Sequence, residues 1–366
     1  MKSNKYKICF ISPKAYLLFN PAIEGVFGGA EVQLFQIGKE FSKKNYFEVS
    51  YIVADYGQGE IIKKNGIKLY SSFSFEDVFF IKVIRFVKSF KKTKADIYLQ
   101  RGYTNYSWVI ALLCRICRKR FIFMIAHDNV VDGLNSGFFN KKKFFIKILL
   151  YFSELVVAQN QFQKEGLKNY CSNLKVVRSG YEIIEKNIVK SDYVLWVGRS
   201  EKWKRPELFF DIADSYNDKN FIMICPSAFK KNNYHKELKQ KADKINNLKF
   251  IEGVPFDEID GYFEKAILFV NTSEKEGFPN TFIQSAKNKT PIISLNVNPD
   301  NFLEESQSGM SFNNDYSSLI AGFNKLIEDK EKLIKMGESS YEYVLKYYNL
   351  KINSKELYKL ITSDEK

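Results

Sequence analysis

The sequence predicts an α/β protein with two domains, each built around a parallel sheet. Its 366 residues give room for about two ordinary domains. Short apolar runs alternate along the chain with segments of helical pattern, which is typical of parallel strands joined by helices. Continuous apolar runs such as Ile267–Val270 suit strands that are covered on both faces.

Strands and helices are expected to alternate in both halves of the chain. The expected strands are Tyr6–Ile11, Glu48–Val53, Asp96–Leu99, Arg120–Ile125, Leu155–Ala158, Tyr193–Val197, Phe221–Cys225, Lys249–Ile251, Ile267–Val270 and Pro291–Ser294. The expected helices are Ala30–Phe41, Glu76–Lys92, Asn105–Cys117, Lys142–Phe152, Pro206–Tyr216, His235–Ile245, Thr281–Asn288, Tyr316–Glu328 and Tyr341–Ile361. Because ligands of open parallel sheets bind at the carboxyl ends of the strands, chemistry is expected in the loops there.

A polar segment interrupts this alternation and marks the boundary between the domains. We place the first domain at residues 1–178, a linker at 179–191, the second domain at 192–340 and a C-terminal helix within 341–366. The net charge of +14 changes at the same point: residues 1–178 carry +16 and the remainder −2. One basic and one near-neutral module is therefore expected, which argues against a uniformly basic coat for nucleic acid.

Composition excludes several other classes of protein. Five scattered cysteines form no disulfide framework, and the lone Cys114–Cys117 pair lacks the partners of a zinc site. The apolar run Ile8–Ser12 is too short for a secretory signal, and no run is long enough to span a bilayer. No Asp-x-Asp metal motif occurs, so neither a metal nor a cofactor is expected. A cytoplasmic location fits best.

The strongest functional motif is Glu276-Gly277-Phe278-Pro279-Asn280-Thr281, which follows an expected strand and opens a helix. Gly277 permits close approach of a ligand, Pro279 suits a helix start, and the free amides of the first turn favour phosphate. A second motif, Gly198 to Glu207, also follows a strand. It supplies Arg199 and Lys204, two side chains suited to phosphate oxygens, although strand-end cations are more often plain surface charges.

Two weaker motifs lie in the first half. Gly28 and Gly29 precede the first long helix, but the third glycine of a dinucleotide fingerprint is missing, so an ordinary flexible loop is an equal interpretation. His127 directly follows the strand that ends at Ile125. A lone histidine is more often structural, yet its place at a strand end favours a functional role.

Together and in this order, the four motifs resemble those of the retaining, GT-B-type glycosyltransferases of family 4 (glycosyl transferases group 1). The resemblance covers nearly the whole chain and implies two Rossmann-like domains facing across a cleft. The second would bind a nucleotide-sugar and the first an acceptor, with the C-terminal helix crossing back to the first. It implies transfer of a sugar from a UDP- or GDP-sugar to a hydroxyl of a glycan or lipid-linked acceptor in cell-surface polysaccharide synthesis, without metal.

The resemblance also assigns roles by position. The implied catalytic residues are His127, Glu276, Arg199 and Lys204, the last two as the diphosphate clamp. The implied donor-binding residues also include Gly28, Gly29, Gly277, Phe278, Pro279, Asn280, Thr281 and Gln284. Gln284 stands where the family has a second acid; an amide still hydrogen-bonds ribose hydroxyls, but a mechanism with two carboxylates is lost. Acceptor binding is expected at Arg101, Asp128 and Asn129.

The basic first half suggests a partner. Residues 78–94 and 140–152 combine lysines and arginines with apolar residues at helical spacing, a pattern typical of reversible contact with an anionic membrane. An ordinary solvated helix face is the competing interpretation. The protein is therefore expected to be peripheral on the inner face of the membrane, without binding nucleic acid. A nucleotide-sugar epimerase of related fold and a noncatalytic nucleotide-sugar or membrane-binding module stay open as alternatives.

Overall fold

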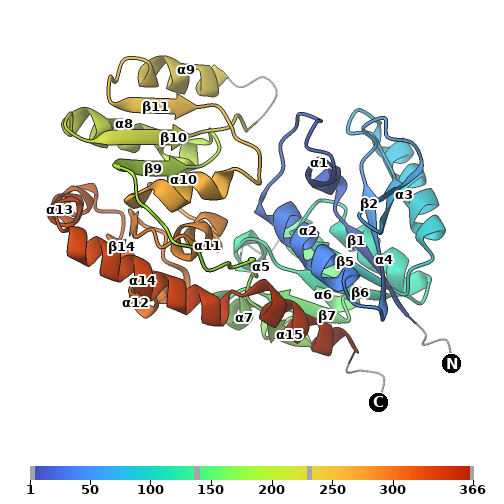
Figure 1. Cartoon of the computed structure of the whole chain (residues 1–366). Coiled ribbons are helices and arrows are strands. Elements are labelled where there is room, and N and C mark those ends of the chain that lie inside the picture. The colour runs from blue at the N-terminus through green and yellow to red at the C-terminus, as the bar shows by residue number, and fades with distance from the viewer. Residues whose placement is uncertain (1–4, 136–140, 229–232, 363–366) are drawn as a thin grey trace. The chain divides into compact units, whose positions relative to one another are not determined.

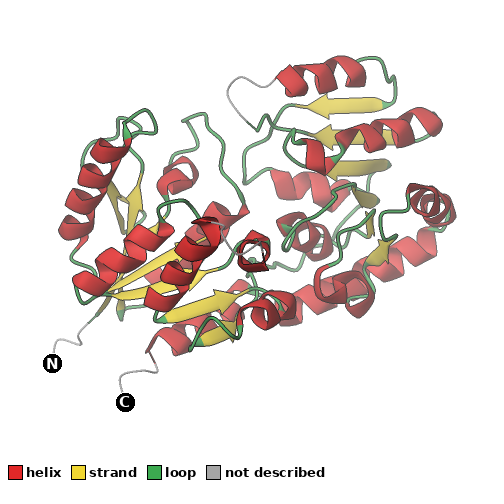
Figure 2. Ribbon diagram, turned by 180° about the vertical axis from the view of Figure 1, so that it is seen from behind, coloured by secondary structure: helices red, strands yellow, loops and turns green. Residues whose placement is uncertain are grey.

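The computed structural model describes residues 5–135, 141–228 and 233–362 (Figure 1). The chain divides into two compact units, the first made of Met1–Tyr181 with Leu350–Lys366 and the second of Glu182–Asn349. Each unit contains one sheet whose strands are joined by helices (Figure 2). The α/β class and the two mainly parallel sheets predicted from the sequence are confirmed.

The first sheet has eight strands in the order β3-β4-β2-β1-β5-β6-β7-β8. Its strands are β1 (Tyr6–Ile11), β2 (Phe47–Val53), β3 (Ile61–Lys64), β4 (Ile67–Ser71), β5 (Ile97–Arg101), β6 (Arg120–Met124), β7 (Leu155–Ala158) and β8 (Leu174–Val176). Only the β3–β4 pair is antiparallel. Asn65 and Gly66 join these two strands with φ of 50° and 81°, the left-handed conformation that an Asn-Gly hairpin turn requires.

Helices cover both faces of the first sheet. They are η1 (Pro13–Ala15), α1 (Tyr16–Phe19), α2 (Gly29–Ser42), α3 (Phe79–Thr93), α4 (Ser107–Ile116), α5 (Asn129–Asn135), α6 (Lys141–Phe152), α7 (Gln161–Leu167) and α15 (Leu350–Thr362). Side chains alternate between the faces along β1: Ile8 and Phe10 join the core under α2 and α15, while Cys9 and Ile11 join the core under α4 and α6.

The second sheet has six parallel strands in the order β11-β10-β9-β12-β13-β14. They are β9 (Tyr193–Val197), β10 (Asn220–Ile224), β11 (Leu248–Ile251), β12 (Leu268–Asn271), β13 (Ile292–Ser294) and β14 (Gly309–Ser311). The helices are η2 (Lys202–Lys204), α8 (Pro206–Ser215), α9 (Asn233–Ala242), α10 (Ile259–Lys265), α11 (Asn280–Lys287), η3 (Pro299–Asn301), α12 (Phe302–Glu305), α13 (Tyr316–Ile327) and α14 (Lys330–Tyr347). Because β9 and β12 are neighbours, the loops that follow them meet at one carboxyl edge.

One expected helix is wrong in its extent. Tyr341–Ile361 is not a single helix: α14 ends at Tyr347 in the second unit, and α15 begins at Leu350 in the first. Tyr348 leaves the helical conformation and packs its ring against Phe278 and Phe302. The sequence offers neither glycine nor proline there, so packing rather than local propensity ends the helix. Among the helices of the described residues, none combines the length and apolar composition needed to cross a bilayer.

Candidate functional site

In the second unit, two of the predicted motifs meet through an ion pair. The Lys204 ammonium lies 2.7 Å from Oε2 of Glu276, and the side-chain amide of Asn271 donates to Oε1 of Glu276 at 3.1 Å. Both charged side chains keep only 13% of their surface accessible. An acid and a base from motifs 72 residues apart in the sequence are thus held together at the carboxyl edge of β9 and β12.

Two hydrogen bonds fix the loop that carries Lys204 to the residues after β12, and a third holds one of those residues, Thr272. The Trp196 indole donates to the Thr272 hydroxyl at 2.9 Å, and that hydroxyl donates to the carbonyl of Lys204 at 2.7 Å. The amide of Glu274 donates to the carbonyl of Trp203 at 2.8 Å. Since both backbone positions beside the ammonium are anchored, the ion pair needs little ordering when a ligand arrives.

The carboxyl of Glu276 is ionised despite its burial. Burial alone would raise its pKa, but the neighbouring Lys204 ammonium and the hydrogen bonds to the carboxylate outweigh this effect, so the pKa lies below its usual value. The ammonium of Lys204 also lies 4.4 Å from the centre of the Trp203 ring, a favourable cation–π distance. The site therefore presents a fixed carboxylate next to a fixed cation.

Arg199 lies on the same loop in a more open position. Its guanidinium is 3.3 Å from the Glu201 carboxylate, and 37% of its side chain is accessible. It is thus more exposed than Lys204 and can change its contacts at lower cost. A planar guanidinium of this kind suits bidentate contact with phosphate oxygens.

The Glu276 motif leads into α11 as the sequence predicts. Gly277, Phe278 and Pro279 are buried, and the Phe278 ring packs edge-on against Phe302, leaving only its backbone for a ligand. Pro279 precedes the first helical residue, Asn280, and no side chain caps this end of the helix. Asn280 and Thr281 are half-buried, and Gln284 is buried one turn further along α11.

In the first unit, three predicted motifs lie together at the carboxyl edge of the first sheet. Gly102 follows β5 with a φ of +84°, and a Cβ placed on it would lie 3.4 Å from the Cβ of Ala126 and 3.8 Å from that of Ala30. The strand end at Arg101, the loop leading to His127 and the start of α2 after Gly29 are therefore neighbours. Gly28 donates its amide to the Glu31 carboxylate at 2.8 Å, which caps α2.

His127 and its neighbours lie on the loop between β6 and α5. His127 and Asn129 are exposed, and Asp128 is half-buried. Oδ1 of Asp128 accepts a hydrogen bond from the Gln163 side chain at 2.9 Å, and the Gln163 side-chain oxygen accepts one from the backbone amide of Gln159. Asp128 is thus linked through Gln163 to Gln159, whose side chain holds Arg101.

Arg101 is buried inside the first unit. Its Nη2 donates to the Gln159 side chain at 2.6 Å and to the Ser179 hydroxyl at 2.9 Å. Burial lowers the pKa of its guanidinium to about 10, which still leaves it protonated at neutral pH. Only 8% of the residue's surface stays accessible, so Arg101 is more enclosed than its predicted place at a strand end implied.

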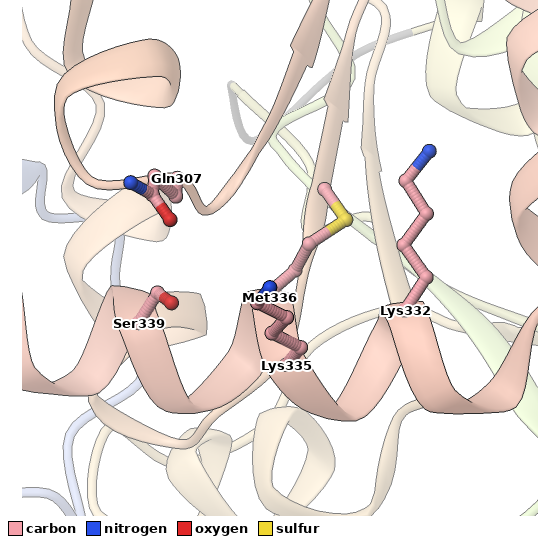
Figure 3. Close-up of a pocket in the computed structure, with 5 residues that line it drawn as sticks. All are labelled: Gln307, Lys332, Lys335, Met336 and Ser339. Carbon is pink, nitrogen blue, oxygen red and sulfur yellow. The ribbon is translucent and has the colours of Figure 1, made fainter.

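A separate surface hollow has no link to these motifs. It encloses about 370 Å³ and is lined by Gln307, Lys332, Lys335, Met336 and Ser339, four of which project from α14 (Figure 3). In the part of the chain that the structure describes, no group of three or more His, Cys, Asp or Glu side chains is arranged to hold a metal ion.

Sequence reasoning missed the polar residues that orient the predicted ones. Asn271 holds the Glu276 carboxylate, and Thr272 holds the loop of Lys204. Their signal was present: both are polar residues directly after the buried apolar strand Ile267–Val270. Gln159 carries the same signal, because it directly follows the apolar strand Leu155–Ala158, whereas Gln163 lies inside a helix and carries none.

A family comparison agrees with the site in the second unit. Residues 182–343 match the model of the family described as "Glycosyl transferases group 1". The match covers nearly the whole of the second unit, Glu182–Asn349. Arg199, Lys204 and Glu276 all lie inside the matched range.

A curated protein that is similar to this chain comes from Methanocaldococcus jannaschii. It is called an uncharacterized glycosyltransferase and is 23% identical over 242 residues, covering 58% of each chain. The chain thus spans less than two thirds of the length of this relative.

Solved glycosyltransferase-like structures resemble the whole chain. Sucrose-phosphate synthase of Thermosynechococcus elongatus has a TM-score of 0.80 at 15% identity, covering 98% of this chain and 99% of that one. The structure of a TarM mutant of S. aureus in complex with fondaparinux, alpha-GlcNAc-glycerol and UDP has a TM-score of 0.76 at 13% identity. The match covers 98% of this chain and 100% of that chain. The structure of Anabaena HepE in complex with UDP has a TM-score of 0.69 at 15% identity, and the match covers 98% of this chain and 100% of that chain. At these identities the likeness shows the fold, which is the predicted GT-B class.

Proposed function

We propose that this protein is a retaining glycosyltransferase that moves a sugar from a UDP- or GDP-sugar to a hydroxyl of a glycan or lipid-linked acceptor. The observation that carries the proposal is the Lys204–Glu276 pair beside the uncapped N-terminus of α11. A cation and helix amides favour a diphosphate, while an ionised carboxylate next to them suits sugar hydroxyls. UDP in the structures of HepE and TarM supports the choice of nucleotide.

In the proposed reaction, the bond between the sugar's anomeric carbon and the donor's diphosphate oxygen breaks, and a bond to the acceptor oxygen forms on the same face. The leaving diphosphate takes the proton of the attacking hydroxyl, so no separate base is required. Arg199, Lys204 and the amides of Asn280 and Thr281 stabilise the charge that develops on the diphosphate. Glu276 orients the sugar, and Gln284 hydrogen-bonds the ribose. This assignment needs no metal ion.

The first unit is proposed to bind the acceptor. His127 lies next to the start of α2 in space, since Gly102 borders both Ala126 and Ala30. We propose that His127 acts on the donor sugar, that Gly28 and Gly29 contact its phosphates, and that Asp128 and Asn129 contact the acceptor. Cell-surface polysaccharide or lipid-linked glycan synthesis on the cytoplasmic side is the role we propose.

Thermal unfolding with nucleoside diphosphates tests the proposal directly. UDP or GDP is expected to raise the melting temperature of the purified chain, because a ligand that binds only the folded state stabilises it. Incubation with a panel of nucleotide-sugars then separates the functions. Slow donor hydrolysis supports a transferase, whereas isomerisation of the sugar indicates an epimerase and binding without turnover a noncatalytic module. Stabilisation by none of the nucleotides contradicts donor binding.

We also propose that α3 rests on an anionic membrane. Apolar side chains project from both sides of this helix: Phe90 is buried, whereas Phe80 and Ile84 keep 76% and 68% of their surface accessible. Basic residues flank them at Lys82 and Arg85. Some basic residues of α3 already form ion pairs within the first unit. Arg85 is paired with Asp77, and both Lys88 and Lys92 are paired with Glu60. The exposed apolar face should therefore contribute as much to binding as charge does.

Flotation with lipid vesicles tests this contact. Phe80→Ser combined with Ile84→Ser is expected to weaken binding to phosphatidylglycerol vesicles at least about tenfold, because two large apolar side chains lose their burial in lipid. Ile334→Ser on α14 is the matched control, since Ile334 is also 65% accessible but lies in the other unit. Equal binding by the double variant and the control, or no binding by the wild type at any salt concentration, contradicts the proposal.

A further inference from the structure

The buried guanidinium of Arg101 has no counter-charge in the described part of the chain. Its recorded partners are the neutral oxygens of Gln159 and Ser179, and no carboxylate of residues 5–135, 141–228 or 233–362 forms an ion pair with it. An arginine keeps its proton even where burial lowers its pKa, so this charge persists inside the unit. An uncompensated buried charge costs several kcal/mol unless another group offsets it.

Hydrogen-bond donors around Arg101 also lack acceptors. Of the enclosed polar atoms that lack a hydrogen-bond partner in the described residues, three are donors near Arg101: Nε of Arg101, Nε2 of Gln159 and Nε2 of Gln33. They belong to one network, because the Ser179 hydroxyl donates to Gln159 at 3.1 Å and the next amide, Gly180, donates to Gln33 at 3.0 Å. A fixed positive charge with surplus donors is the chemistry that binds an oxyanion.

The network is linked to the edge of the sheet assigned to the acceptor. Gly102, the residue after Arg101, borders the loop of His127 and the start of α2. Asp128 on the same loop reaches Arg101 through Gln163 and Gln159. An anionic group bound at Arg101 would thus hold the rest of its molecule close to these loops.

We propose that Arg101, with Gln159, Ser179 and Gln33, binds a phosphate, diphosphate or carboxylate group of the acceptor. The proposal rests on the proposed function and names its substrate class: an anionic acceptor rather than a neutral sugar. The oxyanion accepts from the guanidinium and from the surplus amide donors, and it supplies the charge that the protein does not. The donor's own diphosphate offers the same chemistry, so the experiment distinguishes the two sources.

Thermal unfolding with inorganic phosphate is the test. Phosphate is expected to raise the melting temperature of the full-length protein by about 2 °C or more at saturation, and Arg101→Gln is expected to abolish this shift. Arg101→Lys, which keeps the charge, should retain part of it. Arg120→Gln is the matched control, because Arg120 lies at the opposite end of the neighbouring strand and is paired with Glu154 at 2.6 Å. An unchanged phosphate response in Arg101→Gln overturns the proposal.

Two further arms complete the test. The phosphate titration is repeated with the Lys204→Ala variant. If phosphate binds at Arg101 and not at the proposed phosphate site of the second unit, the rise in melting temperature persists in this variant. UDP is then titrated against Arg101→Gln. An unchanged shift in melting temperature with UDP supports binding of an acceptor group, whereas a lost shift assigns Arg101 to the donor and overturns the proposal.

The result also separates this proposal from the proposed function. If no nucleotide stabilises the wild type but phosphate stabilises it through Arg101, the proposed transferase function is contradicted and the anion site is supported. Should Arg101→Gln not fold, Gln33→Leu removes one surplus donor, and an unreduced phosphate response in it counts against the site.

Discussion

Two buried cations at the carboxyl edges of two similar sheets have opposite surroundings. Lys204 in the second unit faces the Glu276 carboxylate at 2.7 Å, whereas Arg101 in the first faces only neutral oxygens. The Lys204 site is electrically balanced before any ligand binds, whereas the Arg101 site is not. A ligand at Lys204 must therefore compete with a carboxylate, while a ligand at Arg101 compensates a charge. The carboxyl edges of two similar sheets thus favour different kinds of binding.

The largest expected effect is a loss of turnover when Lys204 or Arg199 is removed. Lys204→Ala and Arg199→Ala are each expected to lower the turnover number by about 10²-fold or more, because each removes a preorganised charge next to the leaving group. Nucleotide release from a donor sugar, measured on folded variants, gives the rates. Lys202→Ala serves as the control, since Lys202 is an exposed neighbour on the same turn. Near-normal turnover of both alanine variants would exclude the assigned site.

Unfolding in urea should separate the two cations by their effect on stability. Lys204→Met leaves Glu276 buried without its partner and is expected to cost about 3 kcal/mol of unfolding free energy. Arg101→Met removes an uncompensated buried charge but also the hydrogen bonds to Gln159 and Ser179, and because these two effects oppose each other, the expected loss is smaller than for Lys204→Met. Equal losses in both variants would show that the contrast between the two sites is not energetic.

The contribution of Glu276 to the unfolding free energy is expected to decrease at acidic pH. The pKa of Glu276 is lower in the folded chain than its usual value of about 4.3, so the unfolded chain binds a proton first as pH falls. Its contribution is complete above that value and is lost as pH falls through the folded pKa. The stability difference between wild type and Glu276→Gln is therefore expected to shrink below about pH 4. A constant difference across urea titrations at several pH values contradicts this.

A half-buried lysine, Lys190, shows the effect of burial on a side chain whose hydrogen bonds go to neutral oxygens. Lys190 donates to the carbonyl of Asn288 and the hydroxyl of Thr290, and burial lowers its pKa to about 7. Between that value and its ordinary 10.5, the unfolded chain holds a proton that the folded chain has released, so stability should rise with pH across this range. Lys190→Met should show a flatter rise in melting temperature, and an identical slope would contradict the shift.

Local patterns predicted much of this architecture, while partners distant in the sequence escaped prediction. The expected bounds of β1, β7 and β9 match the structure residue for residue, because their apolar runs are flanked by polar residues. The β3–β4 hairpin was missed although Asn65-Gly66 is a recognisable turn signal. Adjacent strands bring the segments of Lys204 and Glu276 to one edge of the sheet, but the ion pair between them was not predicted. The Arg101 partners could not be predicted, since they lie 58 and 78 residues away on segments without a motif.

The return of the chain to its first unit has a consequence for synthesis. Leu350, Leu357 and Ile361 of α15 belong to the same core as Leu34 and Ile37 of α2. During translation, residues 182–349 emerge before α15, so the second unit can fold while the first still exposes part of its apolar surface. Domains usually fold in the order in which they leave the ribosome. Here the unit that begins first is completed last, and a ribosome that stalls after the second unit leaves an unfinished core open to aggregation.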